Sequence, residues 1–302
     1  MDPDLIAKIA QIASVLEVSG YPKPGNVHRT QDFEDMMFED FLISGIVIGN
    51  TMRKAAEQGS KCKNINELCN INLGRLIKEA VEETNKWVMN NTNLGIIMLL
   101  CPISASAGYS MNFPDLRDNI HEIIRATTPD DAVKLYDAIN LADAGGMGER
   151  EDLDVGNEKA KEELLENDIN IFQVLEISSS WDALAYELTH RMPVTFEVGY
   201  PTYKKLKKSH GTNKATVQTF LTILSMKRDT LISRKYNNTI SQRVKADAKI
   251  ILDKGGILTE EGQSLLLKFD QDLMNKKYNP GTTADLTASS LMLALLEEHW
   301  ND

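Results

Sequence analysis

Apolar residues recur every three or four positions along nearly the whole chain, which is the spacing that one face of an α-helix produces. The clearest examples are Leu5, Ile6, Ile9, Ile12, Ala13 and Leu16; Leu76, Ile77, Ala80, Val81 and Trp87; Val217, Phe220, Leu221, Ile223 and Leu224; and Leu286, Leu291, Leu293, Leu295 and Leu296. One run, Val194–Val198, has the composition of a strand, but Pro193 and Pro201 flank it, so we expect an extended loop there. The sequence therefore predicts an all-α fold, with residues 1–302 forming a single multi-helix domain.

The first predicted helix ends at a turn with two prolines, Pro22–Asn26, which reads Pro-Lys-Pro-Gly-Asn. Neither proline can donate a backbone hydrogen bond and each favours an extended predecessor, so we expect this turn to be rigid. A second helix is expected to start at Phe33, where apolar residues are spaced four apart, and this would place Asp35 beside its apolar stripe. The turn offers cations and amides to an anion, and the acidic helix start offers carboxylates to a proton or a metal ion. The alternative is a capped helix–turn–helix with a solvated acidic face.

The charge of the chain limits its partners. The formal net charge is −11, and 42% of the residues are hydrophobic, which is enough for a sizeable core. A nucleic-acid or anionic-membrane binder needs a basic face, so neither partner is expected. The three cysteines, Cys62, Cys69 and Cys101, lack the spacing of a zinc half-site and indicate reduced thiols in a cytoplasmic protein. The most apolar run, 96–107, contains Pro102 and is too short to span a bilayer, which needs about 20 residues.

Two segments resemble helix N-termini that could bind an anion. Residues 90–95 read Asn-Asn-Thr-Asn-Leu-Gly, and their side chains are of the kind that caps free backbone amides. Residues 280–288 begin with Pro-Gly-Thr-Thr, so we expect Thr282 or Thr283 to cap the last helix and Asp285 to lie in its first turn. The structural alternative in both cases is a well-capped core helix. Small residues at 104–108 would also let another helix approach closely.

Other polar segments carry less information. The lysine run 204–208 and the charged residues around 226–235 are interpreted as solvated surface. The glycine loop 144–148 lacks the preceding strand that a dinucleotide fingerprint requires, and the acids after it fit either a metal loop or a disordered one. Spacings typical of zinc sites or nucleophilic hydrolases are absent from the sequence.

Taken together, several windows resemble the triphosphoribosyl-dephospho-coenzyme A synthase family. They are Glu17-Val18-Ser19 with Pro22-Lys23-Pro24-Gly25-Asn26-Val27, Asp35-Met36 with Phe41 and Ser44, Asn91-Thr92 with Gly95, Asp229-Thr230 with Arg234, and Pro280-Gly281 with Ala284-Asp285-Leu286 and Ala288. The resemblance implies an all-helical fold with a central cleft lined by helix N-termini. It also implies Mg²⁺-dependent transfer of the triphosphoribosyl part of ATP to a ribose hydroxyl of dephospho-CoA, with release of adenine. The oligomeric state, a homo-oligomer among the options, is left open.

The sequence departs from the family pattern twice. Bacterial members have Thr-His-Lys-Gly where this chain has Thr92-Asn93-Leu94-Gly95, and Gly-Ala-Arg-Gly-Glu where it has Gly145-Gly146-Met147-Gly148-Glu149. Both changes remove charge from a triphosphate site. We therefore keep two alternatives, a related ribosyl transferase with a different acceptor and a helical nucleotide- or coenzyme-binding protein without catalysis.

The residue roles that follow combine the resemblance with the demands of the chemistry. Breaking a C1′–N glycosidic bond needs a carboxylate near the oxocarbenium-like carbon and a base for the attacking hydroxyl, and Asp35 and Asp285 are assigned these roles in either order. Asp229 and Asp35 are the expected metal ligands, and Glu17 is expected to pair with Lys23. The substrate-binding set is Lys23, Gly25, Asn26, Asn91, Asn93, Gly95, Arg234, Gly281 and Thr283.

Overall fold

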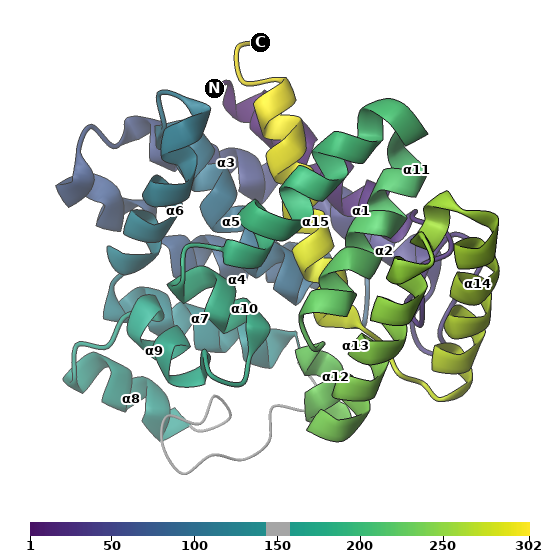
Figure 1. The fold of residues 1–302 in the computed structure, drawn as a ribbon. Coiled ribbons are helices and arrows are strands. Elements are labelled where there is room, and N and C mark those ends of the chain that lie inside the picture. Colours follow the sequence, from purple (N-terminus) through teal and green to yellow (C-terminus); the bar gives the residue numbers. More distant parts are fainter. Residues whose placement is uncertain (143–157) are drawn as a thin grey trace. The chain divides into compact units, whose positions relative to one another are not determined.

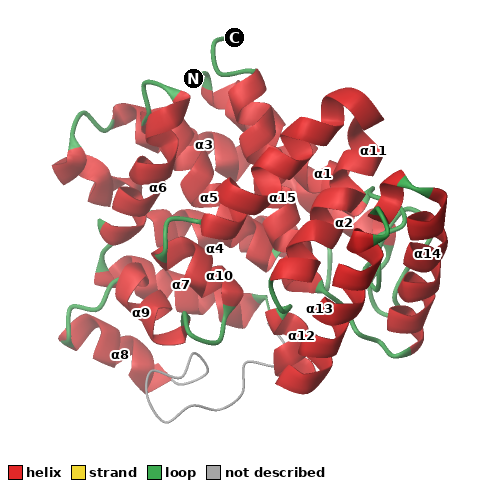
Figure 2. Ribbon diagram, in the orientation of Figure 1, coloured by secondary structure: helices red, strands yellow, loops and turns green. Residues whose placement is uncertain are grey.

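The computed structural model describes residues 1–142 and 158–302, and in these ranges its named elements are all helices, joined by loops, as Figure 2 shows. The all-α prediction is therefore confirmed. The described helices are α1 (Pro3–Val18), α2 (Phe38–Val47), α3 (Gly49–Lys61), α4 (Leu73–Asn85), α5 (Leu94–Tyr109), α6 (Leu116–Arg125), α7 (Pro129–Leu141), α8 (Glu158–Glu166), α9 (Ile171–Ser178), α10 (Ala183–Thr189), α11 (Tyr200–Met226), α12 (Thr230–Lys235), α13 (Asn238–Asp253), α14 (Glu260–Asn275) and α15 (Gly281–Glu298). Shorter turns are η1 (Ile65–Ile71), η2 (Phe113–Asp115), η3 (Thr195–Gly199) and η4 (Gly256–Leu258).

The chain divides into two compact units, each built from stretches that are distant in sequence (Figure 1). The first unit comprises Met1–Ile12, Ile43–Met192 and Leu295–Asp302, and the second comprises Ala13–Leu42 and Pro193–Ala294. The single-domain assignment and the shared central cleft stay predictions. The glycine loop 145–149 lies outside the described residues.

The first unit is built around α5, which is buried along almost its whole length. The small residues predicted to allow a close helix approach do so, since a Cβ at Gly108 would lie 2.0 Å from the carbonyl oxygen of Ala56 on α3. The contact is reciprocal, because a Cβ at Gly59 of α3 would lie 2.0 Å from the carbonyl oxygen of Ala105. Backbone-to-backbone packing of α3 on α5 therefore depends on glycine at both positions.

The second unit has an apolar core contributed by five helices, α11 to α15, with η4. Its buried members are Val217, Phe220, Leu221, Leu224, Ile232, Val244, Ala248, Ile251, Ile257, Leu266, Phe269, Leu273 and Ala284. Burying side chains of this size stabilises a fold by about 1.5–3 kcal/mol each before entropy is subtracted. This core fixes α12 and α15, which carry the predicted site residues Arg234, Gly281, Thr283 and Asp285.

The prediction of an extended loop at Val194–Val198 is wrong, because Thr195–Gly199 forms a π-helical turn that leads directly into α11. Thr195 is buried, and its hydroxyl lies 2.9 Å from that of Ser289 on α15. A Cβ at Gly199 would lie 1.9 Å from the Ser290 hydroxyl, so only glycine fits against α15 there. Tertiary packing thus overrides the local strand propensity of the valines and threonine.

Among the described residues, no helix is both long and apolar enough to cross a membrane.

Candidate functional site

The proline-rich turn follows α1 directly, as the sequence predicts. α1 ends at Val18, the Tyr21–Pro22 peptide bond is cis, and Gly25 has a φ of +69°, a backbone conformation that favours glycine. A Cβ at Gly25 would lie 2.4 Å from the carbonyl oxygen of Tyr278, so the turn packs closely on the segment after α14. Gly25 is therefore needed for the shape of the turn, independently of any ligand.

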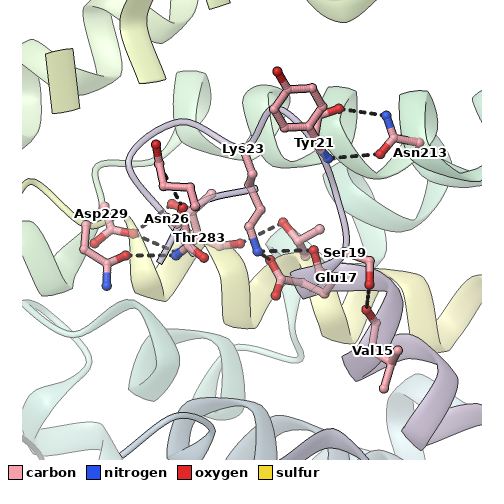
Figure 3. Close-up of polar contacts among 12 residues, drawn as sticks. Val15, Glu17, Ser19, Tyr21, Lys23, Asn26, Asn213, Asp229 and Thr283 are labelled. Carbon is pink, nitrogen blue, oxygen red and sulfur yellow. Dashed lines mark hydrogen bonds and ion pairs between the residues drawn. The ribbon is translucent and has the colours of Figure 1, made fainter. Parts of the chain in front are cut away.

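Lys23 extends from this turn toward the end of α1, where it meets Glu17 (Figure 3). Its ammonium donates to Glu17 Oε1 at 2.6 Å and to the Glu17 carbonyl oxygen at 3.2 Å, which confirms the expected pair. The Lys23 and Glu17 side chains are only 0% and 2% exposed. Burial lowers the pKa of Lys23, and the nearby charges of Glu17 and Asp285 oppose this shift. Lys23 is thus buried and bonded to Glu17, and it lies within the electrostatic influence of Asp285, a predicted catalytic residue.

Asp270, which the sequence analysis did not single out, holds the turn against α14. Its Oδ1 accepts hydrogen bonds from the Gly25 amide at 2.9 Å and from Gln31 Nε2 at 3.1 Å, and its Oδ2 lies 3.0 Å from His28 Nε2. Asp270 and His28 are both buried. The signal in the sequence was an acid placed on the apolar face of an amphipathic helix, among Leu266, Phe269 and Leu273.

Asp229 joins the start of α12 to the start of α15. Oδ1 accepts from the amides of Leu231 and Ile232 at 3.0 and 3.1 Å, and Oδ2 accepts from the amide and hydroxyl of Thr283, both at 2.8 Å. Burial raises the pKa of Asp229, and these hydrogen bonds, together with the charge of Arg234, oppose the shift. Because two donors meet each oxygen, the carboxylate is used as a double helix cap, which does not favour the metal-ligand role predicted for it.

The start of α15 differs from the expectation in two ways. Thr282 and Thr283 do not cap their own helix: Thr283 donates to Asp229, and the Thr282 hydroxyl accepts from the Leu231 amide at 3.2 Å. Asp285 is the fifth residue of α15, so it lies in the second turn and is half-buried. Gly281 is the first residue of the helix and is also half-buried.

Asn26 connects the proline-rich turn to the segment that precedes α15. Its Nδ2 donates to Asn279 Oδ1 at 2.8 Å, and its side chain is buried. Through this bond and through Lys23, the turn and the first turns of α15 form one polar region within the second unit.

Asp35 lies in an exposed loop rather than at a helix start. The second helix begins at Phe38, because Asp32 Oδ1 accepts from the Phe38 amide at 2.7 Å and Asp40 Oδ2 from the Met37 amide at 2.8 Å. The predicted start at Phe33 is therefore wrong, since capping acids set the boundary five residues later. The catalytic and metal roles of Asp35 stay predictions.

The asparagine segment before α5 belongs to the first unit. Asn91 Oδ1 accepts from the Leu94 amide at 3.2 Å, which confirms that this segment caps the helix. Asn93 is buried and its Nδ2 donates to the Ser44 carbonyl at 3.3 Å and to the Thr84 hydroxyl at 3.2 Å. Asn93 is thus bonded within its own unit. Gly95, also predicted to bind substrate, is half-buried in the first turn of α5.

Histidine, cysteine and carboxylate side chains do not form a group of three or more that could hold a metal ion anywhere in the described ranges. Mg²⁺ usually keeps several waters and binds through one or two carboxylates plus substrate phosphates, so a cage of protein ligands is not required for it.

Comparison with solved structures identifies the fold. A crystal structure titled "putative triphosphoribosyl-dephospho-coA synthase from Archaeoglobus fulgidus" superposes with a TM-score of 0.65, and the match covers 85% of this chain and 98% of that one. The two sequences are 23% identical, so the likeness establishes a shared all-helical fold.

The sequence places the chain within a family of that fold. The model of the CitG family, described as ATP:dephospho-CoA triphosphoribosyl transferase, matches residues 3–302, and the chain belongs to this family. Relatives named "Probable 2-(5''-triphosphoribosyl)-3'-dephosphocoenzyme-A synthase" include those of Lactiplantibacillus plantarum, 23% identical over 98% of both chains, and Citrobacter koseri, 24% identical over 98% of this chain and 91% of the relative. The match with one from Pseudomonas fluorescens is 30% identical but spans 37% of this chain and 38% of the relative.

Proposed function

We propose that the protein transfers the triphosphoribosyl group of ATP to a ribose hydroxyl of 3′-dephospho-CoA and releases adenine. The observation that carries this proposal is the family match over residues 3–302, which includes both the proline-rich turn and the start of α15. The relatives from Lactiplantibacillus plantarum and Citrobacter koseri, which align over nearly their whole lengths, bear the name of this synthase.

The polar region around Lys23 supports the chemistry. Cleavage of the C1′–N bond builds positive charge on the ribose, and a carboxylate beside that carbon stabilises it. Asp285 is half-buried in α15 and lies within the electrostatic influence of the Lys23 ammonium. Asp285 is therefore our first choice for stabilising the ribosyl cation, and Asp35 is the remaining candidate for the base that takes the proton of the attacking hydroxyl.

Magnesium fits this proposal as a partner of the nucleotide. Asp35 lies in an exposed loop that solvent reaches, whereas the carboxylate of Asp229 is buried. When bound, Mg²⁺ would neutralise part of the triphosphate charge, which a chain of net charge −11 otherwise repels.

The test is release of free adenine from ATP and Mg²⁺, with and without dephospho-CoA, followed by chromatography. Asp285→Ala should keep the helical circular dichroism of the wild type and release no adenine. Asp272→Ala is the matched control, because Asp272 is an exposed acid of α14 paired with Lys276, and it should keep full activity. Turnover by Asp285→Ala at the wild-type rate would contradict the assignment.

The buried Asn93 favours one alternative, a related ribosyl transferase with another acceptor. Family members have a histidine at this position, and here the amide is bonded to Ser44 and Thr84. Adenine release that does not depend on dephospho-CoA would support this alternative. If ATP binds without releasing adenine under either condition, the chain is a nucleotide-binding protein without catalysis.

A further inference from the structure

Arg29, not Lys23, is the residue through which the proline-rich turn presents positive charge to solvent. The Lys23 side chain is 0% exposed and its ammonium is bonded to Glu17, so it is not available to a ligand that arrives from water. Arg29 lies six residues further along the same loop and is exposed. A guanidinium carries five N–H donors in a planar fork that matches the oxygens of a phosphate group.

Arg29 is held in place by two neighbours. Its Nη2 donates to Asn213 Oδ1 at 2.6 Å, and its guanidinium carbon lies 5.7 Å from the centre of the Tyr21 ring. Asn213 is itself fixed, since Oδ1 also accepts from the Tyr21 amide at 3.0 Å and Nδ2 donates to the Tyr21 carbonyl at 2.7 Å (Figure 3). An arginine held in this way loses less rotamer entropy when it binds an anion.

A bend in α11 brings Asn213 to this position. Gly211 has φ +77° and ψ 168°, so the helix is interrupted there, and α11 changes direction in Figure 1. A Cβ at Gly211 would meet nothing within 4 Å, so the bend is open on that side. The bend is the point at which α11 presents Asn213 to the loop that carries Tyr21 and Arg29.

The sequence around this point is locally basic in an acidic chain. No aspartate or glutamate occurs between Glu197 and Asp229, nor between Glu17 and Asp32. The first of these stretches contains Lys204, Lys205, Lys207, Lys208, Lys214, Lys227 and Arg228. Both stretches belong to the second unit, and each attracts an anion more than the acidic average of the chain does.

We infer that Arg29, positioned by Asn213 and Tyr21, binds the phosphate chain of a nucleotide substrate. The identity of that substrate, ATP or dephospho-CoA, rests on the proposed function, and both carry linked phosphates. The guanidinium donates to phosphate oxygens, while Asn213 keeps the fork turned outward. Lys23 then has a separate task, which is to balance Glu17 and Asp285 inside the protein.

The binding test uses the full chain and inorganic tripolyphosphate, measured by isothermal titration calorimetry. Arg29→Gln should weaken binding by about tenfold or more, the effect expected for losing charge-assisted hydrogen bonds to an anion. Arg29→Lys, which keeps the charge but not the fork, should fall between Arg29→Gln and the wild type. Arg243→Gln is the control, because Arg243 is an exposed arginine of α13 facing Asp247, and it should bind as the wild type does.

Kinetics then identify which phosphate chain is bound. An Arg29→Gln effect on the KM for ATP alone assigns the site to the triphosphate, and an effect on the KM for dephospho-CoA alone assigns it to the diphosphate. The inference is overturned if Arg29→Gln binds tripolyphosphate as tightly as the wild type, or if Arg243→Gln loses as much affinity. Failure of the wild type to release adenine would refute the proposed activity only, because the calorimetric comparison does not depend on turnover.

Discussion

Lys23→Met should strongly destabilise the protein, because it leaves the Glu17 carboxylate buried without its partner. The two side chains are 0% and 2% exposed and their charged atoms are 2.6 Å apart, so little solvent screens them. Removing one member of a buried ion pair costs about 3–5 kcal/mol. Since whole domains are stable by only about 5–15 kcal/mol, this is a large part of the total.

The double variant Lys23→Met, Glu17→Gln should recover most of this loss, because replacing both charges by neutral groups of similar shape leaves no unpaired ion. Unfolding in urea should be followed by far-ultraviolet circular dichroism. Tryptophan fluorescence is unsuitable, because Trp87, Trp181 and Trp300 all belong to the first unit. Hydrogen exchange in residues 13–42 provides a local measurement in the second unit.

The pH dependence of Lys23→Met gives a second check. Burial raises the pKa of Glu17, and Lys23 is the group that opposes this shift, so the variant should have a still higher folded-state pKa for Glu17. The folded chain then binds a proton that the unfolded chain lacks, and stability should rise as the pH falls from neutral toward 4.5, the ordinary value. A Lys23→Met protein as stable as the wild type at neutral pH, with weakened ATP binding, would refute this reasoning and make Lys23 a ligand.

Three further changes test the scaffold by urea unfolding. Asp229→Ala removes the cap of both α12 and α15, so at about 0.5–2 kcal/mol per cap it should cost about 1–4 kcal/mol, and an unchanged midpoint would contradict the capping role. Gly25→Ala should lower the free energy of unfolding more than Gly211→Ala does. Both glycines have a positive φ, but only a Cβ at Gly25 would meet a backbone oxygen, at 2.4 Å. Equal losses of stability would show that this contact is unimportant. Leu94→Lys changes a residue that is 8% exposed and should lower the free energy of unfolding by about 2 kcal/mol or more. Leu267→Lys changes a residue that is 45% exposed and should lower it little. Equal stability of both variants would argue that Leu94 is not buried.

Helix content could be predicted from the sequence, but some boundaries could not. The spacing of apolar residues locates α1, α4 and α15 because it reports directly on the buried face of a helix. The same spacing wrongly extends α2 back to Phe33, since Asp32 and Asp40 cap the backbone only from Met37 and Phe38 onward. Local propensity also fails at Thr195–Gly199, where the fit of Gly199 against α15 determines the structure.

The sequence pointed to individual segments of the candidate site but not to the hydrogen bonds that join segments distant in the chain. The pairing of Glu17 with Lys23 could be anticipated, because oppositely charged residues flank a short rigid turn. The cap of α15 could not be anticipated from the sequence. The prediction considered the threonines next to the helix, whereas the acid that accepts from the Thr283 amide lies 54 positions away. Asp270 was missed for the same reason, because its bond to the Gly25 amide spans 245 positions.

The roles of the acids in the second unit follow from what each carboxylate already binds. Glu17, Asp229 and Asp270 are each buried, and each accepts hydrogen bonds from the protein's own groups. A carboxylate used in this way fixes the backbone and stays out of reach of a solvent-borne substrate. Asp285 is half-buried and lies within the electrostatic influence of the Lys23 ammonium. The three buried acids therefore hold the turn and the start of α15, while the action of Asp285 on a bound ribose stays a prediction for the adenine-release test.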